Sequence, residues 1–248
     1  MTLLLLLLST ASAGVKRDVR DAEEAVRTGD FGIAHRLATR AVASGRLPPA
    51  WEARALLARA EADATRETEP AAVLGAVEDY RRALSLEPEL PAAGVQTVLA
   101  NALLARAREA SPEVRPALLE ALVGVRDDVP ARALLCDAAP PERVEAACGA
   151  VLEAAERAER PEPGFARAAQ RLVLQQLTSG DPSRATETLD RSHALLDTWR
   201  ARVEAAGPDE EAELLGPALD RAAATLELAR LTVDLKDPAR AGDALAAL

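Results

Sequence analysis

Residues 28–42 contain, in order, the end of a helix, a turn, and a second helix with small side chains along one face. Gly29 suits the left-handed residue that ends a helix, and Asp30 suits the N-cap of the helix that follows. One face of this second helix then carries small residues: Ala34, Ala38, Ala41 and Val42. Small side chains let another helix approach closely, so the segment predicts two helices packed against each other.

Related patterns return along the chain. A helix closes over residues 80–88 with Tyr80, Ala83 and Pro88, and weaker copies occupy residues 179–185 and 236–241. Repeated helix pairs stack side by side, because one pair cannot bury its apolar face alone. Such a stack forms an extended surface instead of a deep catalytic pocket. The repetition therefore favours a binding scaffold over an enzyme.

The composition predicts helices throughout. Apolar residues make up 49% of the 248 residues, whereas aromatic residues make up only 2%. Ala, Leu, Arg and Glu are abundant and are strong helix formers, and β-branched residues never alternate over the length of a strand. We expect an all-α protein.

Proline, glycine and aspartate divide the chain into about twelve helices, which would form about six antiparallel pairs. The expected helices lie near residues 15–28, 30–44, 50–66, 71–87, 91–110, 112–127, 130–138, 141–160, 165–179, 182–206, 208–235 and from 238 onward.

The first thirteen residues, MTLLLLLLSTASA, resemble a secretory signal peptide. A run of leucines precedes the small residues Ala11, Ser12 and Ala13, and cleavage there would leave Gly14 as the first residue of the mature chain. The run is shorter than the roughly 20 apolar residues that span a bilayer, so we expect no membrane-spanning segment in the mature chain. This predicts export to a bacterial periplasm or cell envelope; the alternative is an uncleaved end on a cytoplasmic protein.

The formal net charge of −10 disfavours nucleic acid as a partner, because the phosphate backbone would repel the protein. Glycines are solitary, so no phosphate-binding loop is present, and no zinc-binding motif occurs. We expect no cofactor and no metal. The repeated helix pairs favour a protein or peptide as the partner.

The chain resembles the tetratricopeptide repeat (TPR) family, well over residues 15–105 and weakly beyond. The matching positions are Gly29, Asp30, Phe31, Ala34 and Ala41 in one unit, Ala76, Tyr80, Ala83 and Pro88 in the next, the segment 99–103 in a third, and Leu172, Gly180, Asp181 and Ala185 in a later one. The resemblance implies a right-handed α-solenoid of about six antiparallel helix pairs in a single domain over residues 14–248. It also implies a non-enzymatic scaffold that binds a protein or peptide segment in its concave groove.

In the family, the first helix of each pair lines the groove. The resemblance therefore implies that the inner surface carries Lys16, Val19, Glu23, Arg27, Thr97, Asn101, Arg167 and Gln170. Amide and charged side chains of this kind pair with the backbone and the carboxylates of a peptide. Asn101 is the sharpest candidate, since an Asn at this position in the family often holds the peptide backbone.

Cys136 and Cys148 lie on either side of the turn at Pro140 and Pro141. If the flanking helices pair antiparallel, the two sulfurs could meet, and an exported protein would join them as a disulfide. The alternative is a pair of free, buried thiols.

No catalytic constellation stands out. His35 and His193 are far apart, and Asp190, Ser192 and His193 share one helix, on which neighbouring side chains diverge. An enzyme using dispersed carboxylates such as Glu120 and Asp197 is a remote alternative. A nearer one is a structural envelope protein that self-associates through its apolar end, residues 241–248. The sequence leaves the oligomeric state open.

Overall fold

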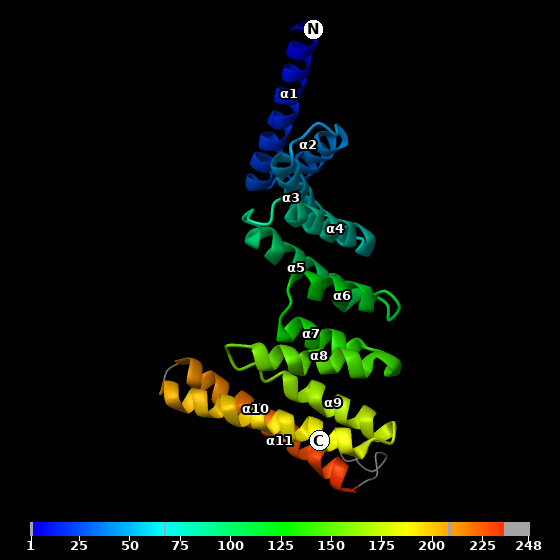
Figure 1. The fold of residues 1–248 in the computed structure, drawn as a ribbon, viewed down its shortest axis with the longest axis vertical. Coiled ribbons are helices and arrows are strands. Elements are labelled where there is room, and N and C mark those ends of the chain that lie inside the picture. Colours follow the sequence, from blue (N-terminus) through cyan, green and yellow to red (C-terminus); the bar gives the residue numbers. More distant parts are fainter. Residues whose placement is uncertain (1, 67, 208–209, 236–248) are drawn as a thin grey trace. The chain divides into compact units, whose positions relative to one another are not determined.

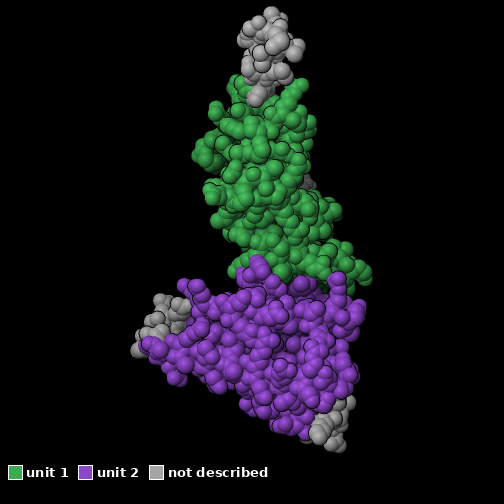
Figure 2. Space-filling model, in the orientation of Figure 1, with its two compact units in different colours: residues 1–126 green, residues 127–248 purple. Residues whose placement is uncertain are grey.

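The computed structural model describes residues 2–66, 68–207 and 210–235, and this part of the chain contains helices and no strands. The all-α class predicted from composition is confirmed. The chain comprises two compact units, residues 1–126 and residues 127–248 (Figure 2).

The described residues of unit 1 form α1 (Thr2–Arg27), α2 (Phe31–Ala43), α3 (Pro49–Arg66), α4 (Pro70–Leu86), α5 (Ala93–Glu109) and α6 (Arg115–Val125). Each helix packs against the next (Figure 1). In addition, α3 contacts both α1 and α5, and α4 contacts α6. The odd-numbered helices of this unit therefore touch one another in succession.

The first three helices meet in layers of small side chains, and each layer takes one residue from each helix. The layers are Val19 with Ala41 and Ala55, Ala22 with Ala38 and Ala58, and Ala25 with Ala34 and Ala62. Residue numbers fall along α2 while they rise along α1 and α3, as antiparallel neighbours require. Side chains this small bring the helix axes close together, which explains the alanine-rich face.

The turn between α1 and α2 has the geometry that its sequence predicts. Gly29 has φ of +80°, and the backbone N–H of Asp30 donates to the carbonyl of Ala25 at 2.7 Å. This is the hydrogen bond of a helix that ends in a left-handed residue. The predicted side-chain cap is wrong, however, because the Asp30 carboxylate makes no capping hydrogen bond. Only its backbone carbonyl accepts the first hydrogen bonds of α2.

The described residues of unit 2 form α7 (Val129–Ala138), the short 3-10 helix η1 (Pro141–Arg143), α8 (Val144–Arg157), α9 (Phe165–Thr178), α10 (Pro182–Ala206) and α11 (Glu210–Leu235). Each α-helix again packs against the next, and α9 also contacts α7 and α11. At the start of α10, the Asp181 carboxylate accepts from the backbone N–H of Arg184 at 3.1 Å. The Asp181 side chain therefore caps α10, whereas that of Asp30 does not cap α2.

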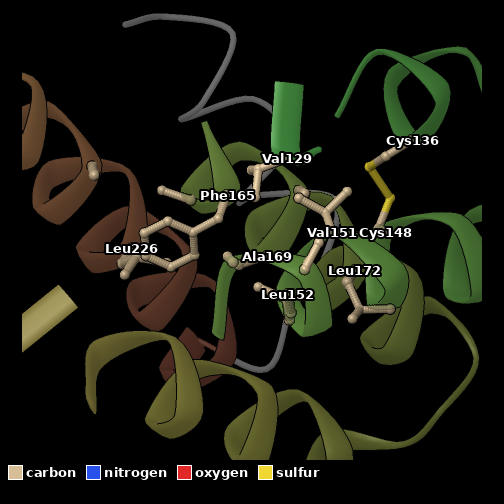
Figure 3. Close-up of a cluster of buried hydrophobic side chains, with 14 of the residues drawn as sticks. Val129, Cys136, Cys148, Val151, Leu152, Phe165, Ala169, Leu172 and Leu226 are labelled. Carbon is tan, nitrogen blue, oxygen red and sulfur yellow. A yellow bond between two sulfur atoms is a disulfide. The ribbon is translucent and has the colours of Figure 1, made fainter. Parts of the chain in front are cut away.

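The core of unit 2 contains larger side chains than the α1–α3 layers of unit 1 (Figure 3). Phe165 of α9 and Trp199 of α10 meet edge to face, with ring centroids 5.1 Å apart. Leu226 of α11 and Leu152 of α8 are buried in the same cluster. Aromatic side chains bury much apolar area each. The cluster also includes Val129 of α7, so it joins all five described α-helices of the unit.

The C-terminal end of α7 is fixed to two other helices. Cys136 of α7 is joined to Cys148 of α8 by a disulfide with an S–S distance of 2.13 Å (Figure 3). The Arg171 guanidinium of α9 donates to the carbonyl of Cys136, and to that of Ala139 at 2.5 Å. Arg171 thereby satisfies carbonyl groups that a helix end leaves without partners.

Three predicted helix starts are wrong. The first helix begins at Thr2 instead of residue 15, so the predicted leader is continuous with it in the structure. The sixth begins at Arg115, because residues 111–114 form a turn in which the Ser111 carbonyl accepts from Val114 and Arg115. The eighth begins at Val144 instead of residue 141, because Pro141–Arg143 form the 3-10 helix η1. The last predicted helix and the apolar end at 241–248 lie outside the described residues. None of the described helices combines the length and the apolar character needed to cross a membrane.

Candidate functional site

The odd-numbered helices of unit 1 border a cleft with a volume of about 440 Å³. Its lining comes from α1, α3, α5 and the connection that precedes α5: Glu23, Val26, Arg54, Leu57, Ala58, Glu61, Leu90, Pro91 and Val95. Most of these side chains are apolar, and the charged ones belong to α1 and α3. The cleft therefore offers a partner both apolar surface and charged groups.

Helix α3 supplies the floor of this cleft because its residues recur at helical spacing. Arg54, Leu57, Ala58 and Glu61 are three or four positions apart and therefore share one face. The opposite face of α3 packs into unit 1, where Ala60 and Leu56 are fully buried. One helix thus serves the core and the cleft at the same time.

A bidentate ion pair between Arg54 and Glu23 joins α1 to α3 across the cleft. The Arg54 guanidinium donates to the Glu23 carboxylate, with Nε–Oε1 at 2.6 Å and Nη2–Oε2 at 2.5 Å. Both side chains are about one-third exposed. The planar fork of Arg matches a carboxylate in this way, and the pair raises the pKa of Arg54 through that hydrogen bond.

Three cationic side chains surround the Trp51 ring at the beginning of α3. Lys16 Nζ, the Arg20 guanidinium and the Arg54 guanidinium lie 5.6, 5.3 and 4.6 Å from the ring centroid. The face of an aromatic ring attracts cations at such distances. Only Arg54 among the three has a carboxylate partner within the described residues, so this end of the helix layer is positively charged.

At the other end of the cleft, the Glu61 carboxylate is a negatively charged group without a described cationic partner. It is half-buried, and no described side chain forms a hydrogen bond or an ion pair with it. Burial raises the pKa of Glu61, because a carboxylate is less well solvated there than in water. Cation-rich and anionic regions thus lie at the two ends of one apolar surface.

The predicted groove residues of α1 fall into different environments. Glu23 lines the cleft, and Lys16 lies beside it against Trp51. Val19 is fully buried between α2 and α3 and belongs to the core. Arg27 is exposed and pairs with Glu24 on its own helix.

The remaining predicted residues do not line this cleft. Thr97 and Asn101 of α5 are exposed, and the Thr97 hydroxyl donates to the carbonyl of Ala93. In unit 2, Gln170 is half-buried, and Arg167 lies 3.4 Å from Asp137 of α7. Of the predicted groove residues, only Glu23 therefore lines the unit 1 cleft, whereas Arg167 and Gln170 belong to another unit.

Of the nine residues that line the cleft, only Glu23 was predicted as a site residue from the sequence. The other eight are Val26, Arg54, Leu57, Ala58, Glu61, Leu90, Pro91 and Val95. The spacing of Leu57 and Glu61 in the third helix was visible in the sequence. Which face of that helix would remain open depends on the packing of α1 and α5, which no local pattern encodes.

A second cleft, of about 390 Å³, lies between α8, α9 and α10 in unit 2. Its two arginines are already engaged, since Arg184 pairs with Glu145 and Arg191 pairs with Glu156. At its base the Thr188 hydroxyl donates to Gln176 Oε1 at 2.9 Å. The polar groups of this cleft mainly satisfy one another, which makes it a weaker candidate than the cleft in unit 1.

The histidines and the hydroxyl groups near them have separate partners. His35 Nδ1 lies 2.5 Å from Asp63 Oδ1 of α3. Asp190 binds Arg230 at 2.9 Å, whereas the Ser192 hydroxyl donates to the carbonyl of Thr188 at 2.7 Å. Asp190, Ser192 and His193 are therefore not arranged as a catalytic triad, as expected for neighbours on one helix.

No protein-family model matches the chain, and no curated protein matches it in sequence. Function is therefore inferred from the geometry of the site.

Proposed function

We propose that this protein is a non-enzymatic helical-repeat scaffold that binds a protein or peptide segment in the unit 1 cleft. The proposal includes a right-handed, TPR-like α-solenoid over residues 14–248. The observation that carries it is the open cleft along α1, α3 and α5, which has an apolar floor and charged ends. The successive contacts of odd-numbered helices in each unit support the repeat arrangement.

A peptide segment suits the chemistry of this cleft. Apolar side chains of a partner would gain free energy by covering the surface that Leu90 and Pro91 leave exposed. The charged groups at its ends would select among partners, because an unmatched charge loses hydration without gaining a partner. The helices hold these groups in place before binding, so little entropy is lost in ordering the scaffold.

We further propose that the protein acts in the periplasm or the cell envelope; the alternative is the cytoplasm. Two features support export. The leucine-rich beginning of the chain resembles a secretory signal, and the Cys136–Cys148 disulfide is of the kind that persists in oxidising compartments.

Site-specific photocrosslinking in the native host tests the groove. A photoreactive residue at Leu90 lies in the cleft, whereas one at Arg36 of α2 lies outside it. We expect the Leu90 variant to form a discrete crosslinked product that the Arg36 variant does not form. Equal products from both positions, or none from Leu90 under several growth conditions, would contradict the proposal.

Self-association is a second candidate, favoured by exposed leucines on α11. Leu214 is 72% exposed and Leu231 is 56% exposed, so a second copy of the chain could cover them. Sedimentation velocity over a hundredfold concentration range distinguishes the two functions. A monomer at all concentrations would rule out self-association, whereas a dimer that Leu231→Glu dissociates would support it.

A further inference from the structure

The Glu61 carboxylate is the one charged group of the unit 1 cleft that has no described partner. Leu57, one helical turn before it on α3, and Leu90, Pro91 and Val95 from the segment around the start of α5 line the same cleft. A carboxylate beside apolar groups loses hydration. A cation bound to Glu61 would compensate for the hydration that its carboxylate has lost.

No other charge in the cleft supplies that cation. The remaining charged groups that line it are Glu23 of α1 and Arg54 of α3, and they are hydrogen bonded to each other. The segment around α5 contributes only apolar side chains to the lining. Glu61 is therefore available to a group from outside the chain.

The cationic cluster around Trp51 determines where a positive group of a partner can bind. Lys16 and Arg20 would repel it from the beginning of α3, where the charge of Arg54 is balanced by Glu23. Glu61 is ten residues beyond Trp51 on the same helix, or about 15 Å at the rise of an α-helix. A cation on the partner would thus be directed to the Glu61 end.

We propose that Glu61 binds an arginine side chain of the partner segment, while an apolar neighbour of that arginine covers Leu90 and Pro91. This inference rests on the proposed function and adds the chemistry of the partner. Arginine fits better than lysine, because its guanidinium is planar, weakly hydrated and able to form two parallel hydrogen bonds with a carboxylate. Its methylene groups would lie along the apolar lining.

Butylguanidinium, which reproduces the end of an arginine side chain, tests the site in solution. The full-length protein is labelled with ¹³C at Glu carboxyl groups and Leu methyl groups, and the Glu61 signal is assigned by its loss in Glu61→Gln. We expect tens of millimolar butylguanidinium to lower the pKa of Glu61 and to shift the Leu57 and Leu90 methyl signals. Uncharged butylurea and equimolar sodium chloride should do neither.

Two variants make the test specific. Glu61→Gln should weaken the butylguanidinium-induced shifts of the Leu57 and Leu90 methyl groups by about tenfold, since a neutral amide replaces the charge. Glu89→Gln changes an exposed carboxylate in the connection between α4 and α5. It should leave the butylguanidinium-induced methyl shifts unchanged. Methyl shifts of equal size in wild type and Glu61→Gln, or equal effects of butylguanidinium and butylurea, would overturn the inference.

The Leu90 crosslinking experiment separates this inference from the groove proposal. We expect the crosslink to decrease at least fivefold when Glu61→Gln is added. An undiminished crosslink in Glu61→Gln would overturn arginine recognition while leaving the groove proposal intact. Absence of the crosslink in wild type would instead contradict the groove itself.

Discussion

At the scale of the residue, the charges of unit 1 are placed unevenly. Glu23 and Arg54 satisfy each other, whereas Glu61 lies half-buried on the same side of α3 without a described cation. Charged groups that lie in a poorly solvated position, and so lower the stability of the fold, are common at binding and catalytic sites. This cost can be measured without knowing the partner.

Glu61→Gln should stabilise the protein at neutral pH, because the amide avoids the cost of a poorly solvated carboxylate. The pKa of Glu61 is raised on folding, so its carboxyl group favours the folded state below the unfolded pKa. This contribution to the free energy of unfolding is lost as the pH rises through the pKa of Glu61 in the folded state. The advantage of the variant should thus be about 0.5 kcal/mol at pH 7, allowing for solvent screening, and vanish below about pH 4.

Urea unfolding of both proteins at pH 4 and pH 7 measures this difference. Glu89→Gln, which changes an exposed carboxylate, provides the control and should change the free energy of unfolding by less than about 0.5 kcal/mol. An equal or lower free energy of unfolding for Glu61→Gln at pH 7 would contradict the burial argument.

At the scale of the element, unit 1 depends on how closely α1, α2 and α3 approach. Ala38 of α2 is fully buried in a layer with Ala22 and Ala58. Because protein interiors are close-packed, even a few added methyl groups must displace a neighbouring helix. The alanines therefore determine the spacing of the helices that form the cleft.

Ala38→Leu should destabilise unit 1 by about 1–3 kcal/mol, the usual cost of overpacking. Ala43→Leu, at the end of the same helix and outside its buried face, should change the free energy of unfolding by less than about 0.5 kcal/mol. Thermal and urea unfolding followed by circular dichroism compare the two. Similar stabilities for both variants would show that the layers tolerate larger side chains.

Two glycines of unit 1 should respond to alanine with opposite signs. Gly29→Ala should destabilise by about 1 kcal/mol, because φ is +80° there and a Cβ is strained. Gly75→Ala should stabilise by up to about 1 kcal/mol, because Gly75 is inside α4 and an added Cβ would meet no atom within 4 Å. Urea unfolding checks both, and a stabilising Gly29→Ala would argue against the left-handed turn.

At the scale of the whole molecule, each compact unit has its own buried clusters. Small side chains fill the layers of unit 1, whereas Phe165, Trp199 and the Cys136–Cys148 disulfide belong to one cluster of unit 2. A change confined to the second cluster should therefore act first on unit 2.

Reduction of the disulfide, or Cys136→Ala with Cys148→Ala, should destabilise unit 2 by about 3 kcal/mol, the loop-entropy value for a loop of this size. Hydrogen exchange followed by mass spectrometry should show faster exchange in α7–α9 and unchanged exchange in α1–α3. Reductant should have no effect on the double variant. Equal acceleration in both units would contradict independent cores.

Much of the local structure could be predicted from the sequence. The ends of α2, α3, α9 and α10 fall within a residue or two of the positions that Gly, Pro and Asp mark. These signals are local, because helix ends depend on backbone geometry and on hydrogen bonds within a few residues. The start of α6 was misplaced for the same reason, since residues 111–114 can form either a helix turn or an isolated turn.

The sequence by itself determined that this chain is all helix, where most helices end, and which face of α2 is small. Only the tertiary structure decided which distant groups meet: Glu23 with Arg54, and His35 with Asp63. It also decided that Val19 is buried while Glu61 remains without a described partner. Such pairings depend on the crossing and register of helices far apart in the chain, and these follow from how all the side chains pack together.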